Sequence, residues 1–403
     1  MIDTRPAPIA LNAPARIPST ALPIETDLRV ERGSVRVDFA RPVHALLGLP
    51  FDAISIGEAT AKLRRAVTQQ QRCFLSTPNV NFLVGARRDE SFRQSVLHSD
   101  LSVVDGMPIV WWARLLGVPI LERVAGADVF EHLSHGALGL PPIRVYFFGG
   151  PEGVAAAASE ALAGHGSGLI GVGGESPGFV PVSSMDLEAT ARRIDASGAD
   201  FVLVALGAQK GQTWIEAMRA RLKAPVIAHL GAVVNFAART VRRAPRWTQR
   251  FGLEWVWRIV EEPALWRRYA SDGLALLHLL WREGRPTLAY LQGARAAQPA
   301  RSRVRLREHA GHGLVLHLGG GLVDDRLASM RAGLAALARS GRSMRVVIES
   351  DAVLGTAAMG LLMLLEGYAR DLGCALDVQV EDARLSRILR LNGLRLGEAA
   401  HSP

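Results

Sequence analysis

Short apolar runs alternate with segments of helical periodicity along the middle of the chain. Runs predicted to be strands are Cys73–Ser76, Leu101–Val104, Arg144–Phe148, Gly168–Val172, Phe201–Ala205 and Pro225–His229. Apolar residues recur at helical spacing in Thr60–Gln70, Val80–Ser99 and Val154–Gly164. This alternation is typical of an α/β fold in which helices cover both faces of a parallel sheet. Ligands of such sheets bind beyond the carboxyl ends of the strands.

The pattern changes on either side of this region. Residues 1–42 are rich in Pro, Ala and Arg without periodicity, which predicts a disordered lead-in before a catalytic domain at 43–235. Residues 236–292 are basic, Trp-rich and helical in pattern, so they are predicted to form an appendage. Residues 293–303 resemble a linker.

A small α/β unit is predicted at 304–395. Strands are expected at Val304–Arg307, Leu314–Leu318, Met344–Glu349 and Ala375–Val380, and helices at Arg326–Arg339, Ala357–Asp371 and Ala383–Leu391. About 90 residues are enough for an independent domain, so the linker and the unit together predict a module that folds separately.

Polar residues follow two of the predicted strands. Asp105 and Gly106 come directly after a buried run, where an acid would stand at the mouth of the sheet as a general base. Thr77 and Asn79 end the preceding strand and could hydrogen-bond a substrate. The alternative is that Asp105, Thr77 and Asn79 only cap the helices that follow.

Two glycine turns and one arginine are candidates for holding a phosphate. Gly149 and Gly150 follow one strand and Gly207 follows another, and backbone amides in such turns can approach an anion. Arg123 lies on a loop bounded by glycines and could neutralise a diphosphate. A surface ion pair with Glu122 or Asp128 is the alternative for Arg123.

Composition excludes several classes of protein. The two cysteines, Cys73 and Cys374, provide neither a disulfide framework nor a zinc motif. No stretch has the length of a signal peptide or a membrane-spanning helix, which predicts a soluble or peripheral protein. Dinucleotide, P-loop and D-x-D motifs are absent, and the histidines lack metal-ligand spacing, so neither a cofactor nor a metal is expected.

The most distinctive segment is 239–269, which carries eight Arg and four Trp against three Glu. The chain as a whole has a formal net charge of +9, which favours anionic partners. Arg beside Trp is typical of a helix at an anionic membrane surface. Packing against the core and binding of nucleic acid are the alternatives.

In their order, these motifs make residues 46–270 resemble the WecG/TagA/CpsF glycosyltransferases, also called glycosyltransferase family 26. The motifs are STPNVNFLV, the Asp105-Gly106 step, LLGVPILERVAGADVF, VYFFGG, ADFVLVALGAQKGQTWI and the basic Trp-rich tail. The resemblance implies a Rossmann-like parallel-sheet glycosyltransferase domain. It also implies inverting, metal-independent transfer from a UDP-sugar, such as N-acetylmannosamine or a uronic acid, to a polyprenyl-diphosphate-linked acceptor in cell-surface or exopolysaccharide biosynthesis.

The resemblance also implies roles for individual residues. Asp105 is the implied general base, and the implied donor site comprises Thr77, Asn79, Gly106, Arg123, Gly149, Gly150, Gly207, Gln209 and Gln212. Contact with the acceptor diphosphate and the membrane is assigned to Arg243, Arg258, Arg267 and Arg268. A cytoplasmic enzyme, peripheral on the inner face of the plasma membrane, follows from these roles, as does the absence of a nucleic-acid partner. A homo-oligomer is compatible with them.

Two stretches depart from the family pattern. Pro263–Trp266 lacks the basic residue often found there, which weakens one expected contact with the acceptor phosphate, and the glycine loop lacks a Gln. The family commonly shows Lys-Gln-Glu in the glycine loop, where this chain has Lys210, Gly211 and Gln212. Gln209 or Gln212 is the candidate replacement for the missing Gln. The departure in the glycine loop keeps open an alternative function, a catalytically inactive scaffold regulated through its C-terminal unit.

The C-terminal unit resembles a STAS domain in its ββαβαβα order and in the stretch RVVIESDAVLGTAAMGLLMLL. STAS domains often carry Asp-Ser at a phosphorylation site, where this chain has Gly355 and Thr356. Thr356 is therefore a candidate regulatory residue. A constitutive docking module for an unknown protein partner is favoured over a phosphorylation switch.

Overall fold

The computed structural model describes residues 27–397 with short gaps; the described ranges are 27–33, 35–136, 140–162, 168–241, 244–245, 248, 253–296, 300–309, 313–323, 326–341 and 343–397. Its centre is a six-stranded sheet in the order β6-β5-β10-β9-β7-β8, and every neighbouring pair is parallel. The strands are β5 (Cys73–Ser76), β6 (Leu101–Ser102), β7 (Ile143–Gly149), β8 (Leu169–Glu175), β9 (Phe201–Ala205) and β10 (Val226–His229). The predicted Rossmann-like parallel sheet is confirmed.

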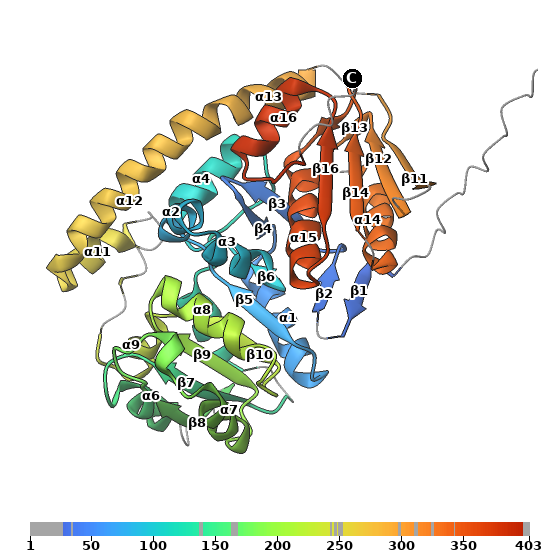
Figure 1. Cartoon of the computed structure of the whole chain (residues 1–403). Coiled ribbons are helices and arrows are strands. Elements are labelled where there is room, and N and C mark those ends of the chain that lie inside the picture. Colours follow the sequence, from blue (N-terminus) through green and yellow to red (C-terminus); the bar gives the residue numbers. More distant parts are fainter. Residues whose placement is uncertain are drawn as a thin grey trace, which may run out of the picture.

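Helices cover both faces of this sheet (Figure 1). They are α1 (Ile56–Thr68), α2 (Val80–Arg88), α3 (Glu90–Leu97), α4 (Met107–Leu115), α5 (Gly126–Ser134), α6 (Val154–Leu162), α7 (Leu187–Ala196), α8 (Ala208–Met218) and α9 (Val233–Ala237). The single helix predicted over 80–99 is broken at Asp89. Asp89 adopts an extended conformation, and its carboxylate caps α3 by accepting hydrogen bonds from the amides of Ser91 and Phe92.

A helical arm, residues 254–296, follows the catalytic sheet and runs along the upper left edge of the molecule in Figure 1. It consists of α11 (Glu254–Glu261), a 3₁₀ turn (Pro263–Leu265), α12 (Trp266–Leu279), a π-helical turn (Leu280–Gly284) and α13 (Arg285–Ala296). The arm packs closely on α4, since a side chain at Gly284 would lie 2.8 Å from the ring of Trp112. The linker predicted at 293–303 begins inside α13.

The C-terminal unit has the elements predicted from the sequence. Its sheet has the order β11-β12-β14-β16, with β11 antiparallel to β12 and the other pairs parallel. The strands are β11 (Arg303–His309), β12 (Gly313–Gly319), β14 (Met344–Ile348) and β16 (Leu376–Val380), with a short parallel pair β13 (Gly321–Leu322) and β15 (Val353–Leu354). The helices are α14 (Ala328–Ser340), α15 (Thr356–Asp371) and α16 (Ala383–Leu391).

The expected lead-in contains one hairpin near its end, and a second hairpin follows it directly. β1 (Arg29–Arg32) pairs with β2 (Val35–Asp38), inside the segment 1–42 that was predicted to be disordered, while residues 1–26 lie outside the described residues. The hairpin is ordered because Val30 and Val37 are buried against the C-terminal unit. A second hairpin, β3 (Val43–Leu46) and β4 (Leu49–Asp52), packs against α15.

The hydrophobic core of the C-terminal unit therefore extends into the N-terminal hairpins and the catalytic domain. One buried cluster joins residues of both N-terminal hairpins and Leu97 of α3 to the helices and strands of the C-terminal unit. Helix α15 is buried on all sides, because one side faces its own sheet and the other faces β3, β4 and α3. The linker suggested a separately folding module, but the packing joins it to the catalytic domain.

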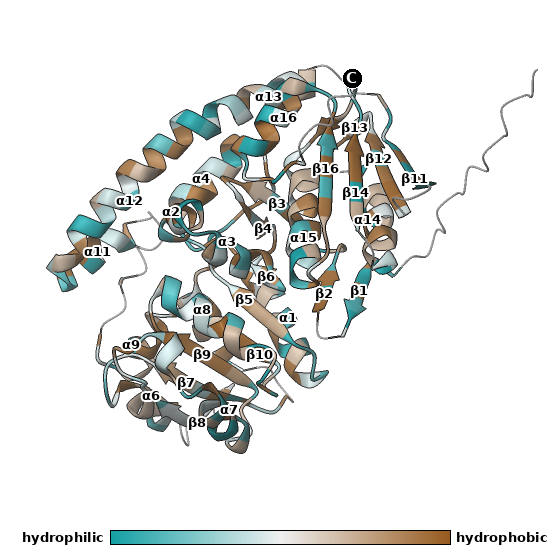
Figure 2. Cartoon of the chain, in the orientation of Figure 1, coloured by the Kyte–Doolittle hydropathy of each residue, from teal (hydrophilic) through white to brown (hydrophobic). Residues whose placement is uncertain are grey.

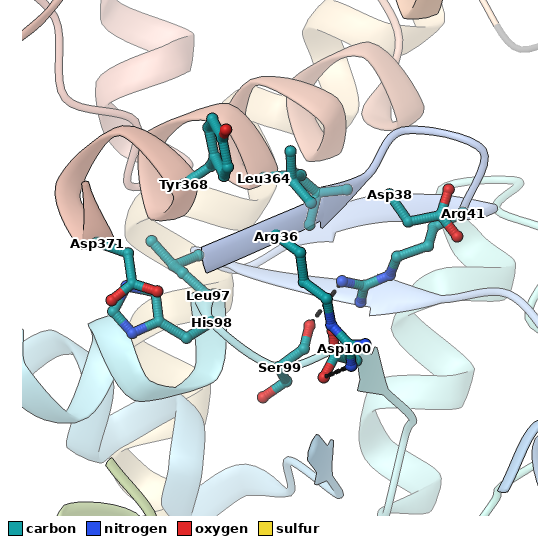
Figure 3. Close-up of a pocket in the computed structure, with 11 residues that line it drawn as sticks. Arg36, Asp38, Arg41, Leu97, His98, Ser99, Asp100, Leu364, Tyr368 and Asp371 are labelled. Atoms are coloured by element: carbon teal, nitrogen blue, oxygen red, sulfur yellow. Dashed lines mark hydrogen bonds and ion pairs between the residues drawn. The ribbon is translucent and has the colours of Figure 1, made fainter. Parts of the chain in front are cut away.

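Polar contacts line a small hollow at this junction, shown in Figure 3. The guanidinium of Arg36 donates hydrogen bonds of 3.0 and 2.8 Å to Asp100, and Arg41 donates one of 2.6 Å to the carbonyl of Ser99. Leu364 and Tyr368 of α15 lie across the hollow from these arginines. The junction thus brings together the first hairpin, the catalytic domain and the C-terminal unit.

Candidate active site

The predicted site segments meet at one edge of the catalytic sheet. Because β6, β5, β10, β9 and β7 are parallel neighbours, their carboxyl ends share that edge. The turns after these strands contain Asp105, Asn79, Gly231, Gly207 and Gly150 respectively. This edge is the candidate active site.

Asp105 is held between the ends of β5 and β6. Its amide donates a 3.1 Å hydrogen bond to the carbonyl of Pro78, which joins the two loops. The N-cap of α4 is Gly106, and no side chain caps that helix, so Asp105 does not serve as its cap. Within the described part of the chain, no hydrogen bond reaches the Asp105 carboxylate, which leaves it available to a substrate.

The surroundings of Asp105 favour its protonated form. Desolvation raises the pKa of Asp105 to about 7, and the charges of Glu254 and Asp128 act in the same direction. Arg123 and Arg258 oppose the shift. A carboxyl whose pKa lies near neutrality can take up a proton and release it again at physiological pH, as a general base must.

Arg123 forms ion pairs with two carboxylates. It lies 3.1 Å from Asp128 and 2.5 Å from Glu254, and its side chain is 12% exposed. The pair with Asp128 was one of the alternatives from the sequence, whereas Glu254 comes from the arm and was not foreseen. Through this contact α11 reaches the catalytic edge. Arg123 consequently has little free charge to offer a diphosphate in this arrangement.

The two polar residues after β5 differ in their surroundings. Asn79 is the N-cap of α2, and its side-chain oxygen accepts a 3.3 Å hydrogen bond from the Phe82 amide. Its amide nitrogen is not used in this cap and lies on the same edge as Asp105. Thr77 is buried, with 5% of its surface exposed.

The glycine turns are positioned by close backbone contacts. A side chain at Gly149 would come within 2.6 Å of the Ala205 carbonyl oxygen, and the Gly150 amide donates a 2.8 Å hydrogen bond to that same carbonyl. Gly149, Gly150 and Gly207 all have positive φ, at 108°, 81° and 80°. These positions require glycine, and the turns after β7 and β9 are tied together.

The two candidate replacements for the missing Gln are both engaged elsewhere. Gln209 is exposed and donates a 2.6 Å hydrogen bond to Asp89 between α2 and α3. Gln212 is fully buried, and its amide donates a 3.1 Å bond to the Ser76 hydroxyl. Beside Gly211 lies His229, a buried residue at the end of β10 that the sequence analysis did not single out.

The basic candidates lie along the arm, except Arg243, which lies outside the described residues. Arg258 of α11 is half-buried near Asp105 and stacks over Phe236 at 6.0 Å. Arg267 and Arg268 of α12 are exposed and stack over Trp266 and Tyr269. Of the three described candidates, Arg258 is the one whose charge acts on Asp105.

Thr356, the candidate regulatory residue, begins α15 and is only 5% exposed. Its hydroxyl lies 2.9 Å from Nδ1 of His44 in β3, so it forms part of the contact between the C-terminal unit and the catalytic domain.

A parallel α/β sheet with a titratable acid and two glycine turns at its carboxyl edge is an architecture that group-transfer enzymes share with other enzymes. Residues 44–289 match the model of the Glycosyl transferase WecG/TagA/CpsF family. The chain belongs to this family, and it is a glycosyltransferase by that membership. The match covers the catalytic sheet and most of the arm, and it ends before the C-terminal unit.

Two curated relatives carry the name N-acetylglucosaminyldiphosphoundecaprenol N-acetyl-beta-D-mannosaminyltransferase. The protein of Bacillus spizizenii is 32% identical over 203 residues, which cover 50% of this chain and 77% of the relative. The protein of Bacillus subtilis strain 168 is 27% identical over 205 residues, covering 51% and 78%. By their names, these relatives transfer a hexosamine to a polyprenyl-diphosphate-linked acceptor.

Proposed function

We propose that this protein is an inverting transferase that moves a hexose from a UDP-sugar to a polyprenyl-diphosphate-linked acceptor in cell-surface or exopolysaccharide biosynthesis. The observation that carries the proposal is Asp105, a carboxyl with a raised pKa at the catalytic edge of a chain that belongs to this family. The relatives' names supply the class of acceptor.

In the proposed reaction, the Asp105 carboxylate accepts the proton of an acceptor hydroxyl. The freed oxygen attacks the anomeric carbon of the donor from the face opposite UDP, a C–O bond forms, and the bond to the diphosphate oxygen breaks. UDP leaves with the electron pair of that bond, so the anomeric centre inverts. Desolvation keeps Asp105 basic enough to take the proton near pH 7.

The departing diphosphate requires positive counter-charge. Backbone amides of the turns at Gly149, Gly150 and Gly207 are the proposed donors of hydrogen bonds, with Thr77, Asn79, Gly106, Gln209 and Gln212 as further donor-site candidates. Arg258 is a cation of the arm whose charge acts on Asp105. Arg123 can contribute positive charge if the substrate displaces Asp128 or Glu254 from its ion pairs. Of these two carboxylates, Glu254 belongs to the arm.

We also propose that the arm seats the enzyme on an anionic membrane surface. No helix among the described residues is long and apolar enough to cross a bilayer. The arm nevertheless exposes large apolar side chains, which are Trp255, Val260, Trp266, Leu274, Leu277 and Trp281. Figure 2 shows hydrophobic and hydrophilic residues interleaved along these helices. Exposed Arg267 and Arg268 stand beside two of the aromatic rings, as in interfacial helices.

For the C-terminal unit we propose a STAS-like role as a constitutive docking element rather than a phosphorylation switch. The strand and helix order supports the likeness, and the burial of Thr356 against His44 supports the constitutive role. A kinase would reach Thr356 only if α15 left the catalytic domain. In the structure this unit docks on the catalytic domain of the same chain.

The test is a screen of UDP-sugars, beginning with UDP-N-acetylmannosamine, against undecaprenyl-diphosphate-N-acetylglucosamine, with the product read by mass spectrometry. The proposal predicts a mass increase of one sugar and a β-anomeric product from an α-linked donor. It also predicts that transfer survives EDTA. Loss in EDTA with rescue by magnesium or manganese would contradict metal independence. A folded protein that binds UDP but transfers no sugar would favour the inactive scaffold.

A further inference from the structure

His229 occupies the centre of the catalytic edge. It is the last residue of β10, which lies between β5 and β9, and only 7% of its surface is exposed. Its ring lies 6.0 Å from that of Phe82 in the first turn of α2. Gly211, in the first turn of α8, also lies against the ring. No step of the proposed reaction uses His229.

His229 and Gly211 fit each other closely. A Cβ at Gly211 would lie 2.2 Å from Cδ2 and 2.9 Å from Nε2 of His229, and the first of these distances is far inside van der Waals contact. Glycine near a helix start is otherwise unfavourable by about 1 kcal/mol relative to alanine. The imidazole therefore explains why position 211 departs from the family's Gln. It occupies the space into which a side chain at 211 would project.

The ring also has polar contacts to satisfy. Burial lowers the pKa of His229 to about 4, so the imidazole is neutral at physiological pH, and a hydrogen bond with the Gly207 backbone opposes the shift. Nε2 is buried and has no partner among the described residues. A ring N–H donates to the Gly207 carbonyl. That carbonyl also accepts a 2.7 Å hydrogen bond from the Gly211 amide at the start of α8.

We propose that His229 is a positioning residue for the sugar-nucleotide donor. It holds the turn Gly207–Gly211 by filling the space beside Gly211 and by bonding the Gly207 carbonyl, and the first amides of α8 then point at the donor diphosphate. In this chain the imidazole of His229 thus occupies space in the donor site that the Gln side chain at position 211 would occupy in family members. The inference rests on the proposed function, since the donor is the UDP-sugar of that reaction.

The test compares His229→Asn with His229→Leu. The side-chain amide of Asn retains an N–H donor for the Gly207 carbonyl, whereas Leu keeps most of the volume and has no donor. Loss of one hydrogen bond corresponds to about a three- to ten-fold weaker interaction. We expect UDP affinity and the donor KM to change by that factor in the Leu variant, with kcat and acceptor KM near the parent values, and Asn to stay within two-fold.

Gly211→Ala provides the steric test. Alone it should weaken UDP binding, since its Cβ collides with the ring. Combined with His229→Ala it should recover thermal stability without recovering UDP affinity, because the bond to Gly207 is still missing. The double variant therefore distinguishes the steric role of the His229 ring beside Gly211 from its hydrogen bond to Gly207.

Hydrogen exchange of the amides at 207–211 gives a readout that does not need the donor. Faster exchange in the Leu variant and parental exchange in the Asn variant are expected. Unchanged exchange and unchanged UDP affinity in a folded Leu variant would overturn the inference. A parent protein that binds no UDP would instead overturn the proposed function, and exchange alone would then decide whether His229 orders this turn.

Discussion

A buried ion pair between Arg93 and Glu366 offers a direct test of whether the C-terminal unit shares its stability with the catalytic domain. Arg93 of α3 is 4% exposed and Glu366 of α15 is 7% exposed. Their side chains form two hydrogen bonds of 2.6 and 3.1 Å, and Arg93 donates another of 2.7 Å to the Gly393 carbonyl. The change Glu366→Ala would leave the buried guanidinium with Glu90, at 3.6 Å, as its remaining carboxylate.

Removing one partner of a buried pair typically costs about 3–5 kcal/mol. At roughly 2 °C per kcal/mol, the lower end for large domains, the midpoint of thermal unfolding should fall by about 6–10 °C. The matched control is Arg370→Ala, which removes an exposed ion pair with Glu90 between the same two helices. That pair is worth at most about 1 kcal/mol, so the control should shift the midpoint by no more than about 2 °C.

Tryptophan fluorescence is the appropriate probe because all eight tryptophans precede residue 282. None lies in the C-terminal unit, so the signal reports the catalytic domain and the arm alone. If the two parts share one core, Glu366→Ala lowers the fluorescence midpoint as well as the circular dichroism midpoint. A fluorescence midpoint equal to that of the parent, with an early loss in circular dichroism only, would refute the shared core.

Three further predictions concern the catalytic edge and the arm. Because Asp105 must be ionised to act as a base, kcat/KM should fall as the pH drops through about 7; a flat profile from pH 6 to 8 would contradict this. The folded protein holds the Asp105 proton more tightly than the unfolded chain, so Asp105→Asn should stabilise at pH 8 and have little effect at pH 4. For the arm, Arg258, Arg267 and Arg268 changed together to Ala should reduce flotation with anionic liposomes, since each basic residue contributes about 1 kcal/mol at such a surface. The control changes exposed Arg65, Arg72 and Arg192 to Ala and so removes the same charge. Equal flotation of both variants would mean that the arm packs on the protein and does not bind the membrane.

The catalytic sheet could be predicted because its signals are local. Each strand is a short apolar run bounded by turn residues, and the strands β5 and β9 have the predicted bounds. Asp105 could be singled out for a related reason, since a polar residue directly after a buried parallel strand must lie at the carboxyl edge. The raised pKa of Asp105 could not be predicted, because the shift depends on burial and on Glu254, a residue distant in sequence.

The contacts between distant segments explain what the sequence did not show. The hairpin at 29–38 has too few apolar residues to indicate order. It is stabilised by packing on the C-terminal unit and by the hydrogen bonds from Arg36 to Asp100. A usable signal existed in α15, where apolar residues surround the helix instead of forming one stripe, which is typical of a fully buried helix. For His229 the signal was the unexpected glycine at 211, but its partner lies on another strand and becomes visible only when β10 is placed beside β9.

The central claim is that Asp105 is the base of a sugar transfer, and Asp105→Asn tests it most directly. The variant keeps the shape of the side chain and cannot accept the proton. The account predicts that turnover with a UDP-sugar and a polyprenyl-diphosphate-linked acceptor falls by about 10²- to 10⁴-fold, while UDP affinity measured by calorimetry stays within three-fold of the parent. Turnover close to that of the parent protein would contradict the account.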